Sequence, residues 1–136
     1  MRVLVDTNVV LDFLQEREPF IKDAAKLFEL IDAGEIEGFI AATTITNIYY
    51  IVRRAVGLAA AEDAITQILT DLQICKVDRA ILEHALALQF RDFEDAVQYA
   101  CALAYGVDAI VTRDVSGFVA SNIPVKSPGE LTLSSN

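Results

Sequence analysis

The chain has few cysteines and no long apolar run. Its 136 residues include only two cysteines, Cys75 and Cys101, too few for a disulfide framework and without metal-ligand spacing. Both lie in apolar runs, so we expect buried free thiols in a reducing compartment. No apolar run approaches the ~20 residues that cross a bilayer, and Asp6 ends the first run too early for a signal peptide. We therefore expect a soluble cytoplasmic protein with no membrane partner.

Basic residues are also scarce. Eleven Lys and Arg face 20 Asp and Glu, which gives a net charge of -9 and a pI of about 4.4. Non-specific binding to nucleic acid depends on clustered bases, so this balance argues against it. The single histidine, His84, has no neighbour that indicates a metal site and is expected to be a packed or surface residue.

Apolar residues are abundant and evenly distributed. They make up 54% of the chain, against 23% charged residues, which excludes a disordered chain or a coiled coil. The sequence has no internal repeat, linker or charge block. Its length suits one hydrophobic core, so we expect a single domain over residues 1–136.

Short apolar stretches alternate with longer amphipathic ones. The pattern predicts strands at 2–5, 37–42, 74–77, 108–112 and 124–127. It predicts helices after Asp6, from Pro19 to Gly34, from Thr43 to Arg54, over 59–72 with Leu69 inward, from Asp78 with Leu82 inward, and from Asp92 to Tyr105. This alternation predicts an α/β fold, a three-layer α/β/α sandwich with a mainly parallel sheet of about five strands. Pro124 predicts that the last strand lies at an edge.

Three acids are predicted to meet at one edge of this sheet. Asp6 and Asp114 follow strands, and Asp95 begins a helix that runs antiparallel to the next strand, which brings its start to the same edge. Ligand sites of open α/β sheets lie at the carboxyl ends of the strands. Each acid also has a structural interpretation: Asp6 as a helix cap, Asp95 as a first-turn acid favoured by the helix dipole, and Asp114 as a turn residue.

Three clustered carboxylates repel one another, and burial adds to the cost. Protons or a divalent cation must offset that repulsion, and oxygen ligands suit Mg²⁺ or Mn²⁺. Such an ion activates water and polarises phosphoryl oxygens. The sequence therefore predicts a metal site suited to phosphodiester hydrolysis.

Four segments resemble a known family over essentially the whole chain. LVDTNVVLD (4–12), ATTITNIYYIVRR (42–54), DFEDAVQYACALAYGVDAIVTRD (92–114) and IPVKSPGEL (123–131) look like a PIN domain, most of all like the toxins of VapC-like toxin–antitoxin modules. The resemblance implies a ribonuclease that depends on Mg²⁺ or Mn²⁺. It assigns the catalytic and metal-binding acids to Asp6, Asp95 and Asp114, with supporting polar residues at Thr7, Asn8, Asn47 and Thr112.

Two positions depart from the family pattern. Asn47 stands where the family usually has a glutamate, and Gly117 stands where many relatives have an acid. An asparagine carbonyl still binds a cation, but with one charge fewer. The expected consequence is weaker metal binding and reduced activity. The alternative is a PIN-fold module that binds RNA or protein without cleavage.

Partners follow from the same resemblance. RNA phosphates are expected to contact Arg53, Arg54, Arg91 and Arg113, although solvated arginines that balance nearby acids have the same pattern. A small antitoxin is expected to cover the acidic cleft with basic side chains, and a homodimer is expected to use the face around Tyr49–Val52. A phosphatase of the haloacid dehalogenase type needs a second aspartate two residues after the first, where this chain has Asn8. A receiver domain needs an aspartate at its third strand and a lysine later, and the sequence offers neither, so both classes rank below the other two interpretations.

Overall fold

A computed structural model describes residues 1–118 and 120–134 and gives a five-stranded sheet. The strands are β1 (Arg2–Val5), β2 (Glu37–Ala41), β3 (Gln73–Cys75), β4 (Ala109–Val111) and β5 (Val125–Lys126). Their order across the sheet is β3-β2-β1-β4-β5, and every pairing is parallel. The predicted α/β/α sandwich is confirmed, with β5 at an edge as expected.

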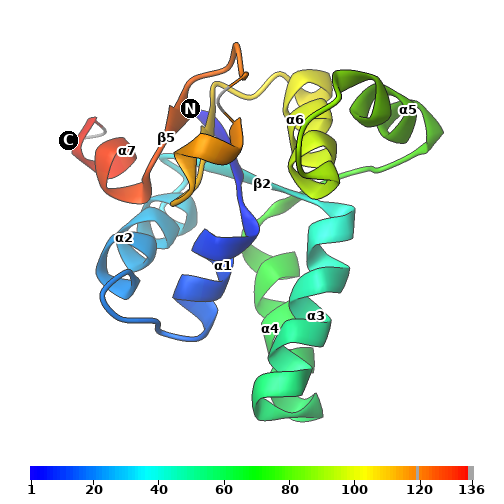
Figure 1. Ribbon diagram of the computed structural model, residues 1–136. Coiled ribbons are helices and arrows are strands. Elements are labelled where there is room, and N and C mark those ends of the chain that lie inside the picture. Colours follow the sequence, from blue (N-terminus) through cyan, green and yellow to red (C-terminus); the bar gives the residue numbers. More distant parts are fainter. Residues whose placement is uncertain (119, 135–136) are drawn as a thin grey trace.

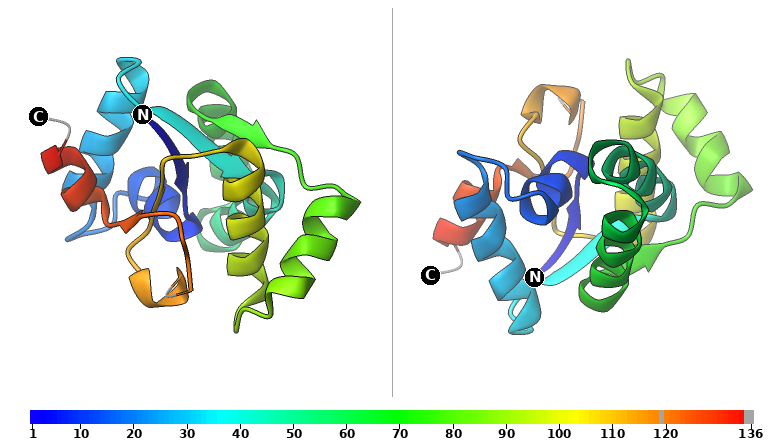
Figure 2. Two further views of the ribbon diagram at one scale, coloured as in Figure 1. Left: turned by 90° about the horizontal axis from the view of Figure 1, so that it is seen from above. Right: turned by 90° about the horizontal axis from the view of Figure 1, so that it is seen from below.

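Helices cover both faces of the sheet (Figure 1). One face carries α1 (Thr7–Leu14), α2 (Ile21–Asp32), α3 (Ala42–Val56), α4 (Leu58–Asp71) and α7 (Pro128–Ser134). The other carries α5 (Arg79–Leu88), α6 (Phe93–Tyr105) and the short 3-10 helix η1 (Val115–Phe118). Figure 2 shows α5 beside α6 on their face of the sheet.

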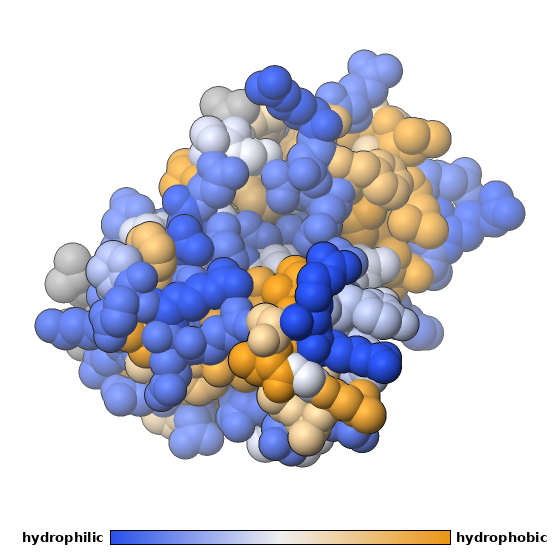
Figure 3. Space-filling view, turned by 60° about the horizontal axis from the view of Figure 1, so that its bottom comes forward, coloured by the Kyte–Doolittle hydropathy of each residue, from blue (hydrophilic) through white to orange (hydrophobic). Residues whose placement is uncertain are grey.

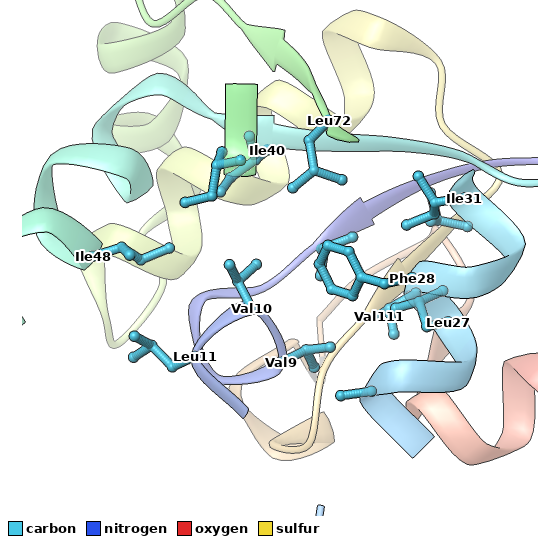
Figure 4. Packing of buried hydrophobic residues seen from close by; sticks show 14 of the residues in the cluster. Val9, Val10, Leu11, Leu27, Phe28, Ile31, Ile40, Ile48, Leu72 and Val111 are labelled. Carbon is cyan, nitrogen blue, oxygen red and sulfur yellow. The ribbon is translucent and has the colours of Figure 1, made fainter. Parts of the chain in front are cut away.

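The strands are apolar without alternation because each side of the sheet is buried. Val3 and Val5 point into the core beneath α1 to α4, and Leu4 between them points into the core beneath α5 and α6. Figure 4 shows side chains of α1 and α2 meeting Ile40 of β2 and Val111 of β4 in the first of these cores. Strands buried on both faces are typical of parallel sheets.

The strand order reverses between β1 and β4. The chain moves outward from β1 through β2 to β3, then returns to the other side of β1 with β4. The backbone amide of Asp6 donates to the carbonyl of Val111 over 2.9 Å, so the chains leaving β1 and β4 remain in contact. A reversal of this kind opens a crevice at the carboxyl edge of an α/β sheet.

Several details of the expected elements are wrong. The helix expected from Thr43 already begins at Ala42, so Thr43 and Thr44 lie within α3, and the helix expected from Pro19 begins only at Ile21. Leu69 is 59% exposed and Leu82 is 40% exposed, since the buried stripes of α4 and α5 are narrower than the periodicity predicts. The sequence reading also missed η1 and α7.

The structure also bears on the expected burial of the cysteines and on the expected lack of a membrane-spanning segment. Cys75 and Cys101 are free and fully buried, as expected. Within residues 1–118 and 120–134, no helix combines the length and apolar character needed to cross a membrane.

Candidate active site

Asp6 is a buried carboxylate held by three hydrogen bonds. It follows β1 directly and caps α1, and its Oδ1 accepts from the backbone amide of Thr7 over 2.7 Å. The same oxygen accepts from Nε2 of Gln98 over 2.8 Å, and Oδ2 accepts from the Thr112 hydroxyl over 2.7 Å. The cap interpretation is thus correct, and it coexists with a fixed carboxylate at the strand reversal. These bonds come from three elements, so the orientation of Asp6 depends on the assembled fold.

Thr112 joins the ends of β1 and β4. Its buried hydroxyl donates to Asp6 and accepts from the backbone amide of Asp114 over 3.0 Å. Nδ2 of Asn8 lies 3.4 Å from the same hydroxyl, and Oδ1 of Asn8 accepts from the backbone amide of Arg113. Asn8 and Thr112 therefore fix the loop that carries Asp114, whose Oδ1 accepts from the Ser116 hydroxyl over 2.6 Å.

Asp95 lies in the first turn of α6, which Asp92 caps. Oδ1 of Asp92 accepts from the backbone amide of Asp95 over 3.1 Å, and Oδ2 of Asp95 lies against Gly117 in the loop that carries Asp114. Burial raises the pKa of Asp95 from 3.8 to about 7, and the negative charges of Asp6, Asp92, Glu94 and Asp114 add to the increase. A raised pKa of this kind marks a carboxylate that lies among like charges.

Gly117 lies against Asp95 and Asp114. A Cβ at position 117 would lie 2.7 Å from Oδ2 of Asp95 and 3.6 Å from Oδ2 of Asp114. A contact of 2.7 Å is too short, so any side chain here would displace Asp95. Glycine at position 117 therefore leaves room for the carboxylate of Asp95 in its present orientation, and a side chain here would require that flexible carboxylate to turn.

Glu94 links the start of α6 to α1 and α3. Its Oε1 accepts from the Thr7 hydroxyl over 2.8 Å, and its Oε2 accepts from Nδ2 of Asn47 over 3.0 Å. Asn47 therefore presents its amide group to Glu94. The resemblance places Asn47 among the supporting polar residues, with a carbonyl able to bind a cation, and does not predict its hydrogen bond to Glu94.

Arg113 is bound within the protein. Its Nε and Nη2 donate to the carboxylate of Asp12, which is 1% exposed, and its guanidinium stacks on the ring of Phe20 at 3.8 Å. Nη1 of Arg17 lies 3.9 Å from the same carboxylate. The guanidinium expected to contact RNA thus neutralises a buried acid of α1.

The other three arginines that were expected to contact RNA are exposed. Arg53 and Arg54 occupy the last turn of α3, and Arg91 precedes α6. Figure 3 shows strongly hydrophilic side chains beside a hydrophobic region on the face that includes the far ends of α3 and α4. On α3, Tyr50 and Ile51 are exposed, Val52 is buried, and the Tyr49 ring packs edge-on against Tyr50.

The ligand chemistry at the sheet edge fits a hard divalent cation. The side chains that converge there offer carboxylate, amide and hydroxyl oxygens, whereas His84 lies exposed on α5 and the cysteines are buried in the core. In the described part of the chain, no three His, Cys, Asp or Glu side chains already lie close enough to hold a metal ion. Mutual repulsion opposes such closure, and a divalent cation would offset it.

The sequence pattern did not predict three contacts of this region, made by Gln98, Glu94 and Asp12. Gln98 donates to Asp6 while its own Oε1 is buried with no hydrogen-bond partner in the structure. A polar residue in the otherwise apolar run AVQYACALA, one turn after Asp95, is a signal that could have found it. Asp12, an acid within the apolar run VVLDFL, has a similar signal. Glu94 has none, because its contacts depend on the relative positions of α1, α3 and α6.

Comparison with known proteins gives consistent matches. Residues 2–116 match the sequence profile of the PIN domain family. The chain is 28% identical over 134 residues to Ribonuclease VapC1 of Aquifex aeolicus (strain VF5), an alignment that covers 95% of this chain and 92% of that protein.

Solved structures share the fold at low sequence identity. Mycobacterium tuberculosis VapC20, a sarcin-ricin loop cleaving toxin, has a TM-score of 0.72 at 17% identity, over 88% of this chain and 95% of its own. VapBC2 from Rickettsia felis, in complex with a DNA fragment from its promoter, has a TM-score of 0.71 at 12% identity, over 93% and 98% of the two chains.

Proposed function

Because the chain belongs to the PIN domain family, we propose that it is a metal-dependent endoribonuclease and the toxin of a toxin–antitoxin module. The observation that carries the proposal is the buried, hydrogen-bonded carboxylate of Asp6 where β1 and β4 diverge, together with the carboxylates of Asp95 and Asp114, which both lie beside Gly117. Asp6 is fixed there by Gln98 and Thr112, and Asp95 lies within the influence of Asp6 and Asp114. The likeness to Ribonuclease VapC1 over nearly the whole of both chains supports the activity.

Asp6, Asp95 and Asp114 would hold Mg²⁺ or Mn²⁺. Such an ion lowers the pKa of a bound water and stabilises charge on a phosphoryl oxygen. Within the protein, Gln98 and Thr112 orient Asp6, while Asn8 and Thr112 hold the Asp114 loop. The raised pKa of Asp95 means that this group binds a proton below about pH 7 and gives it up when a cation binds.

RNA would approach through the arginines that the fold leaves exposed. Arg53 and Arg54 at the end of α3, and Arg91 before α6, are the candidates for phosphate contacts. Arg113 contributes differently, because its ion pair with Asp12 anchors the chain next to Asp114. With a net charge of -9, binding depends on these few local contacts.

A small antitoxin would cover the acidic site with Arg or Lys side chains, which complement its negative charge. The complexes of similar fold, such as VapBC2, support a partner of this kind. We further propose a homodimer through the exposed part of α3 at Tyr50 and Ile51. The buried free thiols suit a protein that acts in the reducing cytoplasm.

The alternative of a binding module without cleavage is not favoured. The two features in its favour were Asn47 and Gly117, which stand where PIN relatives usually have acids. Gly117 leaves room for the Asp95 carboxylate in its present orientation, and Asn47 is paired with a carboxylate of α6, so each departure has a structural role that does not require loss of activity.

A cleavage assay tests the proposal. The purified protein should cut a structured RNA in millimolar Mn²⁺ and not in chelator. Asp6→Asn should reduce the rate by about 100-fold or more, on the scale of losing a main catalytic group. Asp63→Asn, an exposed acid of α4, serves as the matched control and should leave the rate unchanged. Cleavage by Asp6→Asn at the rate of the unaltered protein would contradict the proposal.

A further inference from the structure

We propose that Glu94 is the fourth carboxylate of this site, a positioning and charge-bearing residue held between Thr7 and Asn47. The inference rests on the proposed metal-dependent function and deepens it. It concerns a side chain whose position in the sequence, one residue before Asp95, suggests only a favourable acid at the start of a helix.

The hydrogen bonds of Glu94 do not serve its own helix. Asp92 already caps α6 through the backbone amide of Asp95. Glu94 instead directs one oxygen to the Thr7 hydroxyl at 2.8 Å and the other to the Asn47 amide at 3.0 Å. A half-buried carboxylate that accepts from two different helices is fixed in orientation, and that order costs side-chain entropy. Because Glu94 does not cap its own helix, the ordering of its side chain indicates another role.

The partners of Glu94 connect it to the catalytic acids. Thr7 follows Asp6, and the backbone amide of Thr7 donates to Oδ1 of Asp6 while its hydroxyl donates to Glu94. A single residue thus contacts both carboxylates. On its other side Glu94 precedes Asp95, and its charge acts on that residue. Glu94 consequently adds negative charge between two of the proposed cation ligands.

Asn47 has a defined role in this arrangement. Its amide donates to Glu94, so it stabilises a carboxylate supplied by α6. The pair can in principle be exchanged: a carboxylate at position 47 and an amide at position 94 would keep the hydrogen bond and the net charge. The exchange separates the effect of charge at this place from simple damage to α6.

Calorimetric titration with Mn²⁺ in the intact protein tests the proposal. Glu94→Gln should weaken Mn²⁺ binding by about tenfold or more, as loss of a supporting carboxylate typically does. The exchanged variant N47E/E94Q should bind Mn²⁺ within about threefold of the unaltered protein. Glu62→Gln, an exposed glutamate of α4, is the control and should change nothing. Thermal midpoints in chelator should show that all variants are folded.

The outcomes are distinct. Equal Mn²⁺ affinity in Glu94→Gln and the unaltered protein would overturn the role of Glu94 while leaving the metal site intact. If N47E/E94Q stays as weak as Glu94→Gln, the loss comes from damage to α6 and the inference is wrong. If the unaltered protein binds no Mn²⁺, the metal site itself is contradicted, and this inference with it.

Discussion

Nε of Arg113 donates to Oδ2 of Asp12 over 2.5 Å, and this ion pair joins the loop after β4 to the buried face of α1. Asp12 is 1% exposed, so its charge depends on this partner. Arg17, at 3.9 Å, is a weaker second one. Because Asp114 follows Arg113 directly, the pair also determines where that carboxylate lies.

Arg113→Ala should therefore destabilise the protein by about 3 kcal/mol, since a buried carboxylate loses its main partner. Arg54→Ala, at the exposed end of α3, should change the free energy of unfolding by less than about 0.5 kcal/mol. Urea denaturation of both variants measures the difference. A loss below about 1 kcal/mol for Arg113→Ala would show that Asp12 is stable without it.

Millimolar Mn²⁺ should raise the thermal midpoint of the unaltered protein by about 3–5 °C at roughly ten times Kd, because a ligand bound only by the folded state stabilises it. Asp6→Asn should abolish most of the rise. Asp63→Asn should retain all of it, since Asp63 is exposed on α4, away from the acidic cluster. A midpoint that does not respond at any Mn²⁺ concentration would contradict a cation site.

Asp95→Asn should stabilise the metal-free protein by about 0.5–1 kcal/mol at pH 8, because it removes one of several like charges. The pKa of Asp95 is about 7 in the folded protein, chiefly because of burial and then because of the neighbouring negative charges, against 3.8 for an aspartate in water. The unfolded chain therefore loses this proton first, and the stability of the unaltered protein falls as pH rises from about 4 to about 7.

The gain from Asp95→Asn should grow over the same interval and stay constant above it. Urea denaturation in chelator at pH 4.5, 6 and 8 tests the trend. Destabilisation at pH 8 would mean that the charge of Asp95 at the helix start outweighs the repulsion.

Gly117→Ala should impair the site more than the fold. The new Cβ meets the end of the flexible Asp95 side chain at 2.7 Å, so the carboxylate turns away at a cost of less than about 1 kcal/mol. Mn²⁺ affinity should fall about tenfold as a cation ligand is displaced.

Gly38→Ala provides the opposite case. Its Cβ would meet Leu72 and Ile31 in the packed core at 2.6 and 2.9 Å, so it should cost about 1–3 kcal/mol and leave Mn²⁺ affinity unchanged. Calorimetry and denaturation on both variants separate the two effects. Full Mn²⁺ affinity in Gly117→Ala would mean that Asp95 moves without consequence.

The sequence was sufficient for features that local pattern and topology determine. Strand-sized apolar runs separated by helices predict a parallel sheet, and the carboxyl ends of its strands must share an edge. Asp6 and Thr112 follow adjacent strands, and their side chains are in contact. The cap at Asp78 was equally predictable, because a capping residue acts within its own turn of helix.

The sequence was insufficient where a contact depends on how helices are rotated and displaced. The pairing of Glu94 with Asn47 needs α6 and α3 at a particular separation, and Asp12 finds Arg113 only after β4 is in place. The same limit explains Leu69, whose spacing matches the buried face of α4 although no neighbouring element reaches it closely enough to cover it. Periodicity indicates the direction in which a side chain points along its helix. It does not indicate whether a neighbouring element is long enough to cover that side chain.

The hydrogen bond between Thr112 and Asp6 also makes the site depend on both ends of the chain. These residues are 106 positions apart, yet each needs the other to complete its hydrogen bonds. A growing chain that ends before β4 carries Asp6 without Thr112, Asp95 without the glycine turn beside it, and no Asp114. The carboxylate of the first strand is consequently held in place by a residue from the last quarter of the chain, so a truncated chain would lack both the hydroxyl that orients Asp6 and the acid that follows it.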